Sequence, residues 1–143
     1  MSMLKTFAQR LSRGKIIKRR LPEKFGKIPL YVSPDARLQH VRIGGKGFEQ
    51  ELLRIVSQEI QADSIVWDIG ANVGAFAFAS ASITEQGTVL AVEADIWLAQ
   101  LFRKSVNLKE NQHLNLQILP AAISKQNGVA TFLIAQNGRC SNT

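Results

Sequence analysis

The sequence of 143 residues is poor in the residues that build cross-links and metal sites. Its single cysteine, Cys140, cannot form an internal disulfide. The two histidines, His40 and His113, do not combine with it into a cluster with metal-ligand spacing. A metal-free protein without internal disulfides is therefore predicted.

Long apolar runs are also missing. The longest uncharged apolar-rich run, residues 75–83, is far shorter than the roughly 18 residues that span a bilayer. Lys5 and Arg10 interrupt the amino terminus before a secretory hydrophobic segment can form. Apolar residues make up 45% and charged residues 20%, which is typical of a globular domain. These values predict a cytoplasmic protein with no transmembrane segment.

The net charge of +7 is unevenly distributed. Residues 1–27 contain nine Lys and Arg against one acid, Glu23, so this segment is +8 and residues 28–143 are −1. The pattern predicts a basic arm, 1–27, before a domain, 28–143, and the arm fits a solvated terminus, a peripheral membrane contact, a nucleic acid or an acidic partner. A nucleic-acid partner is disfavoured because no row of aromatic residues alternates with these charges.

Hydrophobic periodicity predicts an alternation of strands and helices. Residues 28–32 and 38–43 are expected as two strands around a turn, and residues 48–60 as an amphipathic helix. Three buried strands are then expected at 64–67, 88–92 and 114–118, with helices at 73–83 and 96–108 between them. Asp95 is positioned to cap the second helix. A hairpin of residues 121–124 and 129–135 around Asn127-Gly128 is expected last.

This alternation indicates an α/β fold, a Rossmann-like doubly wound parallel sheet with helices on both faces. Trp67 and Phe76 are interpreted as core residues, and His113 as a solvated loop residue. In the strand order of such sheets, the strand at 65–69 becomes an edge when a fourth strand is absent.

The glycine-bearing segment 68–74 has the pattern D-x-G-x-N-x-G and lies between a strand and a helix. Its backbone amides and the start of the helix are expected to favour a negatively charged ligand group. The segment matches neither a dinucleotide fingerprint nor a phosphate-binding loop. The acid Asp68 before the glycines fits a ligand that carries an amine beside a carboxylate, as the methionine end of S-adenosylmethionine does.

Glu93 ends the next strand, 23 residues after Gly70. An acid at this position of a nucleotide-binding α/β fold accepts hydrogen bonds from ribose hydroxyls. Asp68, the glycine segment and Glu93 together predict a site for S-adenosylmethionine.

Residues 47–135 resemble the amino-terminal half of an FkbM-like S-adenosylmethionine-dependent methyltransferase. Five features carry the resemblance: Gly47-Phe48-Glu49, the segment 68–74, Val92-Glu93-Ala94, Asn107 with Asn111, and Ala122-Ile123-Ser124 with Gly128 and Phe132. The proline that the family places after the acid is Ala94 here. The family's later K-I-D-V-E-G-like string is absent, so we expect a truncated methyltransferase sheet that ends after the third strand and a hairpin.

The resemblance implies a role for each matching residue. Gly70, Asn72 and Gly74 would shape the methionine pocket beside Asp68, and Glu93 would hold the ribose. Ala121 would border the adenine.

The resemblance also implies O-methylation of a small molecule or a sugar, and no catalytic residue can be named. Two alternatives stay open: a nucleic-acid methyltransferase that uses the basic arm, and an inactive cofactor-binding remnant.

Overall fold

A computed structural model describes residues 14–34, 36 and 48–133. Its elements are, in chain order, β1 (Ile17–Arg20), the 3₁₀ turn η1 (Glu23–Phe25), β2 (Pro29–Val32), α2 (Gln50–Glu59), β3 (Ile65–Ile69), α3 (Ala75–Ala81), β4 (Thr88–Val92), α4 (Ile96–Val106), the 3₁₀ turn η3 (Lys109–Asn111) and β5 (Leu116–Leu119). The strand predicted at 38–43, with His40, lies outside the described residues, as do residues 134 and 135 of the predicted hairpin.

A parallel sheet of order β3-β4-β5 forms the centre of the fold, as the alternation predicted. Its strands are joined through α3 and α4, whose apolar faces pack against the sheet. Asp95 caps α4 as predicted, because its Oδ1 accepts hydrogen bonds from the amides of Trp97 and Leu98 at 2.9 and 3.4 Å. The fold class is confirmed.

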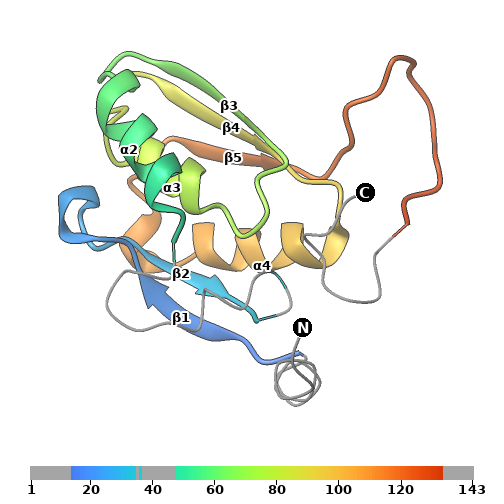
Figure 1. The fold of residues 1–143 in the computed structure, drawn as a ribbon, viewed down its shortest axis with the longest axis horizontal. Coiled ribbons are helices and arrows are strands. Elements are labelled where there is room, and N and C mark those ends of the chain that lie inside the picture. Colours follow the sequence, from blue (N-terminus) through green and yellow to red (C-terminus); the bar gives the residue numbers. More distant parts are fainter. Residues whose placement is uncertain (1–13, 35, 37–47, 134–143) are drawn as a thin grey trace.

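The helix α4 lies between two β layers. Figure 1 shows the three-stranded sheet on one side of this helix and the antiparallel pair β1–β2 on the other. Leu101 and Phe102 of α4 are buried, and so are Leu30 and Val32 of β2. The hairpin therefore covers the face of α4 that is turned away from the parallel sheet.

The hairpin β1–β2 corrects the prediction of a basic arm over residues 1–27. Residues 17–20 pair with residues 29–32, and Leu21 and Phe25 are buried in the core. The side chains of β1 alternate between half-buried, at Ile17 and Arg19, and exposed, at Lys18 and Arg20. The sequence does not reveal this period of two, because three of the four residues are charged. The charges at 15–27 thus belong to the folded domain, and the boundary at residue 27 is not a structural one.

One face of the parallel sheet is not covered by helices in the described part of the chain, contrary to the expectation of cover on both faces. Ile65, Trp67 and Ile69 of β3 are 74, 61 and 57% exposed, whereas Val66 between them is buried. Trp67 was wrongly predicted as core, because an uninterrupted apolar strand does not reveal which face is covered. Phe76 is partly buried against the core, and β3 is the edge strand that the strand order predicted.

The segment after β5 corrects the predicted hairpin of residues 121–124 and 129–135. Residues 120–133 contain no strand and are mostly exposed, and Figure 1 shows them leaving the body as an extended loop. Ile123, Val129 and Leu133 are at least 63% exposed, so within 120–133 these side chains find no apolar surface to cover. The Asn127-Gly128 pair alone does not pair the flanking segments, since an isolated two-stranded hairpin is marginal in water.

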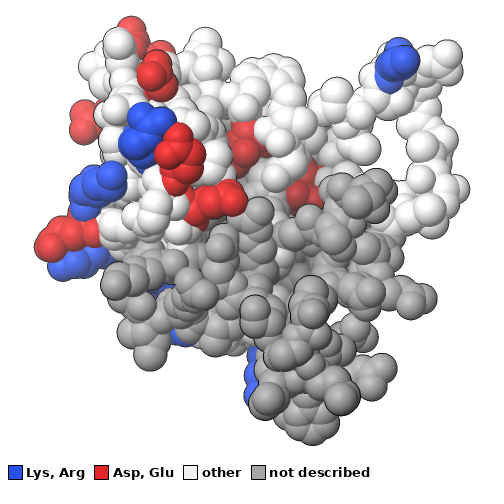
Figure 2. All heavy atoms as spheres, in the orientation of Figure 1, with Lys and Arg blue, Asp and Glu red and all other residues white. Residues whose placement is uncertain are grey.

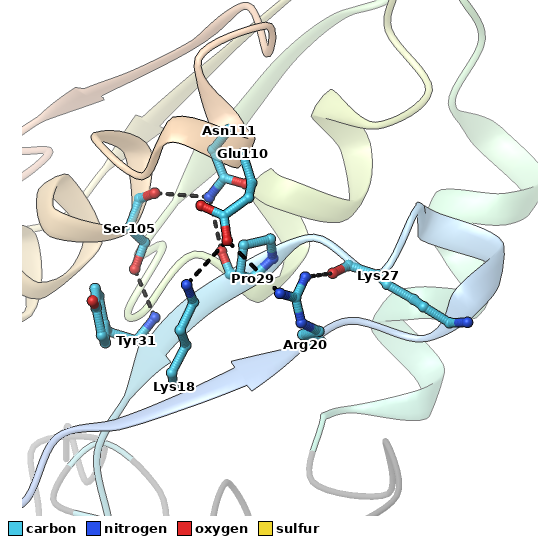
Figure 3. Close-up of polar contacts among 8 residues, drawn as sticks. All are labelled: Lys18, Arg20, Lys27, Pro29, Tyr31, Ser105, Glu110 and Asn111. Atoms are coloured by element: carbon cyan, nitrogen blue, oxygen red, sulfur yellow. Dashed lines mark hydrogen bonds and ion pairs between the residues drawn. The ribbon is translucent and has the colours of Figure 1, made fainter.

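Asn111 fastens the hairpin to α4. Its Nδ2 donates to the carbonyl oxygens of Pro29 and Ser105 at 2.8 and 2.7 Å, and its side chain is buried. Beside it, the Tyr31 amide donates to Ser105 Oγ at 2.8 Å. Figure 3 shows these contacts between β2 and the end of α4.

We predict that Asn111→Ala destabilises the chain by about 2–4 kcal/mol, because the contacts that join β2 to the end of α4 are lost: the Pro29 carbonyl loses the Asn111 donor, and the Ser105 carbonyl keeps only backbone donors. Urea unfolding followed by circular dichroism measures the free energy of unfolding. The control is Asn107→Ala at an exposed position one turn earlier, which should cost less than about 0.5 kcal/mol. Equal unfolding midpoints for the two variants would contradict the role of Asn111.

Candidate cofactor site

The carboxyl ends of β3 and β4 bring together the segment 68–74 and Glu93. Because the two strands are parallel and adjacent, both segments leave the sheet at the same edge. The amides of Gly70 and Ala71 donate to the carbonyl oxygen of Val92 at 2.8 and 3.0 Å. The amide of Ala121 donates to the Glu93 carbonyl at 3.1 Å, so the start of the loop after β5 lies at this edge too.

Glu93 links the glycine segment to the start of α4. Its Oε2 accepts a hydrogen bond from the Asn72 amide at 2.7 Å, and its Oε1 accepts one from the Asp95 amide at 2.8 Å. The residue is only 8% exposed. A buried carboxylate with two amide donors is well stabilised, and its position is fixed by both segments.

The glycine segment turns sharply because three of its residues have positive φ angles. These are 81° at Gly70, 56° at Asn72 and 87° at Gly74. Glycine adopts such angles without steric cost, and asparagine is among the side chains that tolerate them best. The Oδ1 of Asn72 also accepts a hydrogen bond from the Val73 amide at 2.7 Å, which closes the turn.

The backbone amides of residues 70–74 all donate inside the protein. Besides the bonds of residues 70–73 to Val92, Glu93 and Asn72, the Gly74 amide donates to the Ala71 carbonyl at 2.8 Å. This corrects the expectation that these amides point at a negatively charged ligand group. The segment folds back on itself and on β4, so a ligand here would be held by side chains and by shape.

Gly70 and Gly74 have different surroundings. A Cβ atom at Gly70 would meet no heavy atom within 4 Å, so the space beside it is open. A Cβ at Gly74 would lie 2.4 Å from the ring of Phe102, which is fully buried on α4 and packs edge-on against Phe78 at 5.1 Å. Gly74 therefore permits the close approach of α3 and α4, a long-range contact that sequence spacing cannot reveal.

Asp68 has a carboxylate with unused hydrogen-bonding capacity. Its Oδ2 is buried and has no hydrogen-bond partner in the structure. Burial raises the pKa of this carboxyl to about 6, the Ala77 backbone amide opposes the rise, and the nearby Glu93 charge adds to it. Such an atom is ready to accept a hydrogen bond from a ligand donor.

Three further predictions concern His113, metal ligands and membrane spans. His113 is exposed before β5, at the opposite edge of the sheet from Asp68 and Glu93, which confirms its interpretation as a solvated residue. The described residues hold no group of three or more His, Cys, Asp or Glu that could bind a metal ion. None of the helices in the described ranges is long and apolar enough to cross a membrane.

Comparison with known proteins supports the fold. No protein-family model matches the sequence, and no curated protein matches it. Among solved structures, the tRNA (uracil-54, C5)-methyltransferase of Pyrococcus abyssi, in complex with S-adenosyl-L-homocysteine, is 18% identical with a TM-score of 0.53 over 78% of this chain and 26% of that one.

Two further solved structures are similar over shorter or looser alignments. The precorrin-6y C5,15-methyltransferase of Geobacter metallireducens is 24% identical, with a TM-score of 0.43 over 51% of this chain and 39% of that one. The tRNA m1G37 methyltransferase of M. jannaschii is 19% identical, with a TM-score of 0.48 over 76% and 28%. The chain thus spans 39% or less of these three proteins.

The chain has the Rossmann-like α/β fold that occurs in methyltransferases. The parallel order β3-β4-β5 and the similarity to the Pyrococcus abyssi enzyme establish this class. Membership of the FkbM-like family remains a prediction from the residues that carry the resemblance.

We predict that Gly70→Ala and Gly74→Ala differ in stability although both replace a glycine of positive φ. The backbone strain should cost about 1–2 kcal/mol in each variant. Gly74→Ala should cost a further 1–3 kcal/mol or so, because the new Cβ overlaps the buried Phe102 ring. Thermal or urea unfolding of the two proteins provides the comparison, and an equal loss would show that the packing of Gly74 is unimportant.

We predict that Asp68→Asn removes a pH dependence of stability. The pKa of Asp68 is about 6 in the folded chain against about 4 when unfolded, so the protonated carboxyl stabilises the fold below about pH 4. This stabilisation is lost as pH rises through about 6. Asp68→Asn should therefore be more stable than the natural chain at about pH 7, by up to about 3 kcal/mol, and the difference should shrink towards about pH 4.

Urea unfolding at several pH values tests this prediction for Asp68, with the exposed Asp63→Asn as the matched control. A pH-independent difference between Asp68→Asn and the natural chain would contradict it.

Proposed function

We propose that this chain is the cofactor-binding part of an S-adenosylmethionine-dependent methyltransferase. The observation that carries the proposal is the pair of acids at the ends of two adjacent parallel strands, Asp68 and Glu93, with an open glycine segment between them. The similar Pyrococcus abyssi methyltransferase, which was solved with S-adenosyl-L-homocysteine, supports the choice of cofactor. When bound, the cofactor supplies an electrophilic methyl group on a sulfonium.

The two acids have free hydrogen-bond acceptor positions for two parts of this cofactor, the methionine ammonium group and the ribose. Asp68 Oδ2 lacks a partner and would accept a hydrogen bond from the methionine ammonium group. A carboxylate offers about four acceptor positions, and the Glu93 carboxylate has two of them occupied by the Asn72 and Asp95 amides. The other two would receive the ribose hydroxyls. Gly70 leaves space for the ligand beside the main chain, and Ala121 would border the adenine.

The acceptor in this proposal is a hydroxyl of a small molecule or sugar, which rests on the FkbM-like resemblance. Methyl transfer requires an acceptor oxygen aligned with the methyl group and a base for its proton. We assign no base among the described residues. A nucleic acid is the second candidate acceptor, because many exposed Lys and Arg side chains surround the hairpin β1–β2.

We predict that the 143-residue chain binds S-adenosylmethionine and that Glu93→Gln weakens binding tenfold or more. A neutral amide keeps one acceptor but loses the charge-assisted hydrogen bonds, which are worth about 1.5–3 kcal/mol each. Isothermal titration calorimetry measures the affinity, with the exposed Glu85→Gln as a charge-matched control. The affinity of the natural chain should also rise between about pH 5 and 7 as Asp68 ionises, and Asp68→Asn should remove this rise.

Two results would overturn the proposal. One is the absence of binding by a chain that circular dichroism shows to be folded. The other is equal affinity for Glu93→Gln and Glu85→Gln, which would move any cofactor away from the ends of β3 and β4.

A further inference from the structure

The described residues are divided sharply by charge. We call the Lys and Arg side chains of residues 14–27 and 103–110 the basic surface; it consists of Lys15, Lys18, Arg19, Arg20, Lys24, Lys27, Arg103, Lys104 and Lys109. The same two segments contain two acids, Glu23 and Glu110, so their net charge is +7. The other described residues contain two cations and eight acids, or −6. On the face drawn in Figure 2, acidic side chains gather over α2 with a few basic ones among them.

The two parts of the basic surface are held together by the contacts that dock the hairpin on α4. Asn111 and Ser105 bind β2 through Pro29 and Tyr31, and β1 is paired with β2 along its length. Figure 3 shows Lys18 and Arg20 of β1 reaching toward Glu110 of η3. The cations of β1 therefore stand on a strand that is docked against the end of α4 and η3, and not on a separate arm.

Glu110 lies where the two parts meet. Its Oε1 is 3.1 Å from Lys18 Nζ and 3.7 Å from Arg20 Nη2, so this one carboxylate forms ion pairs with two cations. The side chains of Lys18 and Arg20 are still 40 and 55% exposed. Exposed ion pairs contribute little to stability, so these cations can exchange partners at small cost.

The composition of this surface distinguishes between anionic partners. A membrane-bound surface inserts apolar side chains, but the only large exposed apolar residue in these two segments is Ile16. Single-stranded nucleic acid is held by stacking on aromatic side chains, and Phe25 is buried. Lys24 Nζ lies 4.9 Å from the centroid of the Phe25 ring, but that ring is buried and offers no stacking platform to a ligand. A surface that presents mainly charge matches a regularly charged phosphate backbone.

We propose that the basic surface binds the phosphate backbone of a double-stranded nucleic acid, without reading its sequence. The surface includes the carboxyl end of α4, whereas Glu93 and Asp95 lie at the amino end, and a helix of 11 residues separates the two ends by about 15 Å. A duplex can thus bind beside the candidate cofactor site without occupying it. This inference does not depend on the proposed function, since the surface shares no residue with the cofactor site.

The test is fluorescence anisotropy of a labelled RNA duplex of two helical turns, titrated with the full 143-residue chain at several salt concentrations between about 50 and 200 mM. The natural chain should bind with a strong salt dependence. Lys104→Gln/Lys109→Gln should weaken binding about tenfold at low salt and reduce the salt slope by about one for each phosphate that is no longer neutralised. Both side chains are exposed, and no ion pair of the described residues involves them.

The control is Arg54→Gln/Lys125→Gln, which removes the same charge outside the basic surface and should leave affinity unchanged. Glu110→Gln should tighten binding, because it frees Lys18 and Arg20. An equal loss in both double variants would show that only net charge matters and would overturn the proposal. So would binding to phosphatidylserine vesicles without binding to the duplex, or no binding to either. S-adenosylmethionine affinity should be the same in all these variants, so a negative result with the duplex does not bear on the cofactor site.

Discussion

The buried carboxylate of Glu93 is the interaction on which the carboxyl edge of the sheet depends. One of its oxygens holds the amide of Asn72 in the turn after β3, and the other holds the amide of Asp95 before α4. Without this charge, two amides lose their acceptor, and neither the turn nor the helix start has a fixed position relative to β4. The shape of the candidate cofactor site is therefore set by an acid that is itself a candidate ligand group.

Asp68 is destabilised in its charged form by burial and by its position close to Glu93. A second carboxyl near Glu93, largely withdrawn from water, is harder to ionise, and the folded chain contains a buried oxygen without a partner. Strained electrostatics of this kind are concentrated at functional sites, where a bound ligand relieves them. At the other end of α4, the Oδ1 of Asn111 is also buried without a partner among the described residues, but its amide nitrogen donates to two carbonyls and fixes the hairpin.

The order of elements from α2 to β5 could be predicted because each follows from a local signal: apolar periodicity, a capping Asp95 and strands of β-branched residues. Two errors arose where distant parts of the chain decide the outcome. The strand β1 was hidden by its charge, and its pairing with β2 is not encoded in spacing. The exposure of Trp67 depends on what covers a sheet face. In the site, the positions of Asp68 and Glu93 were predictable from strand ends, but Gly74's contact with Phe102 and the internal use of the loop amides were not.

The exposed position of Trp67 gives the molecule an internal reporter. The chain has two tryptophans, and Trp97 on α4 is partly buried against the core while the indole of Trp67 stands largely in water on the uncovered sheet face. Indole emission shifts to shorter wavelength when water is excluded. In a Trp97→Phe background, a shift of the emission to shorter wavelength would therefore report that a polypeptide covers this face. An increase in collisional quenching by iodide would report that the polypeptide has dissociated.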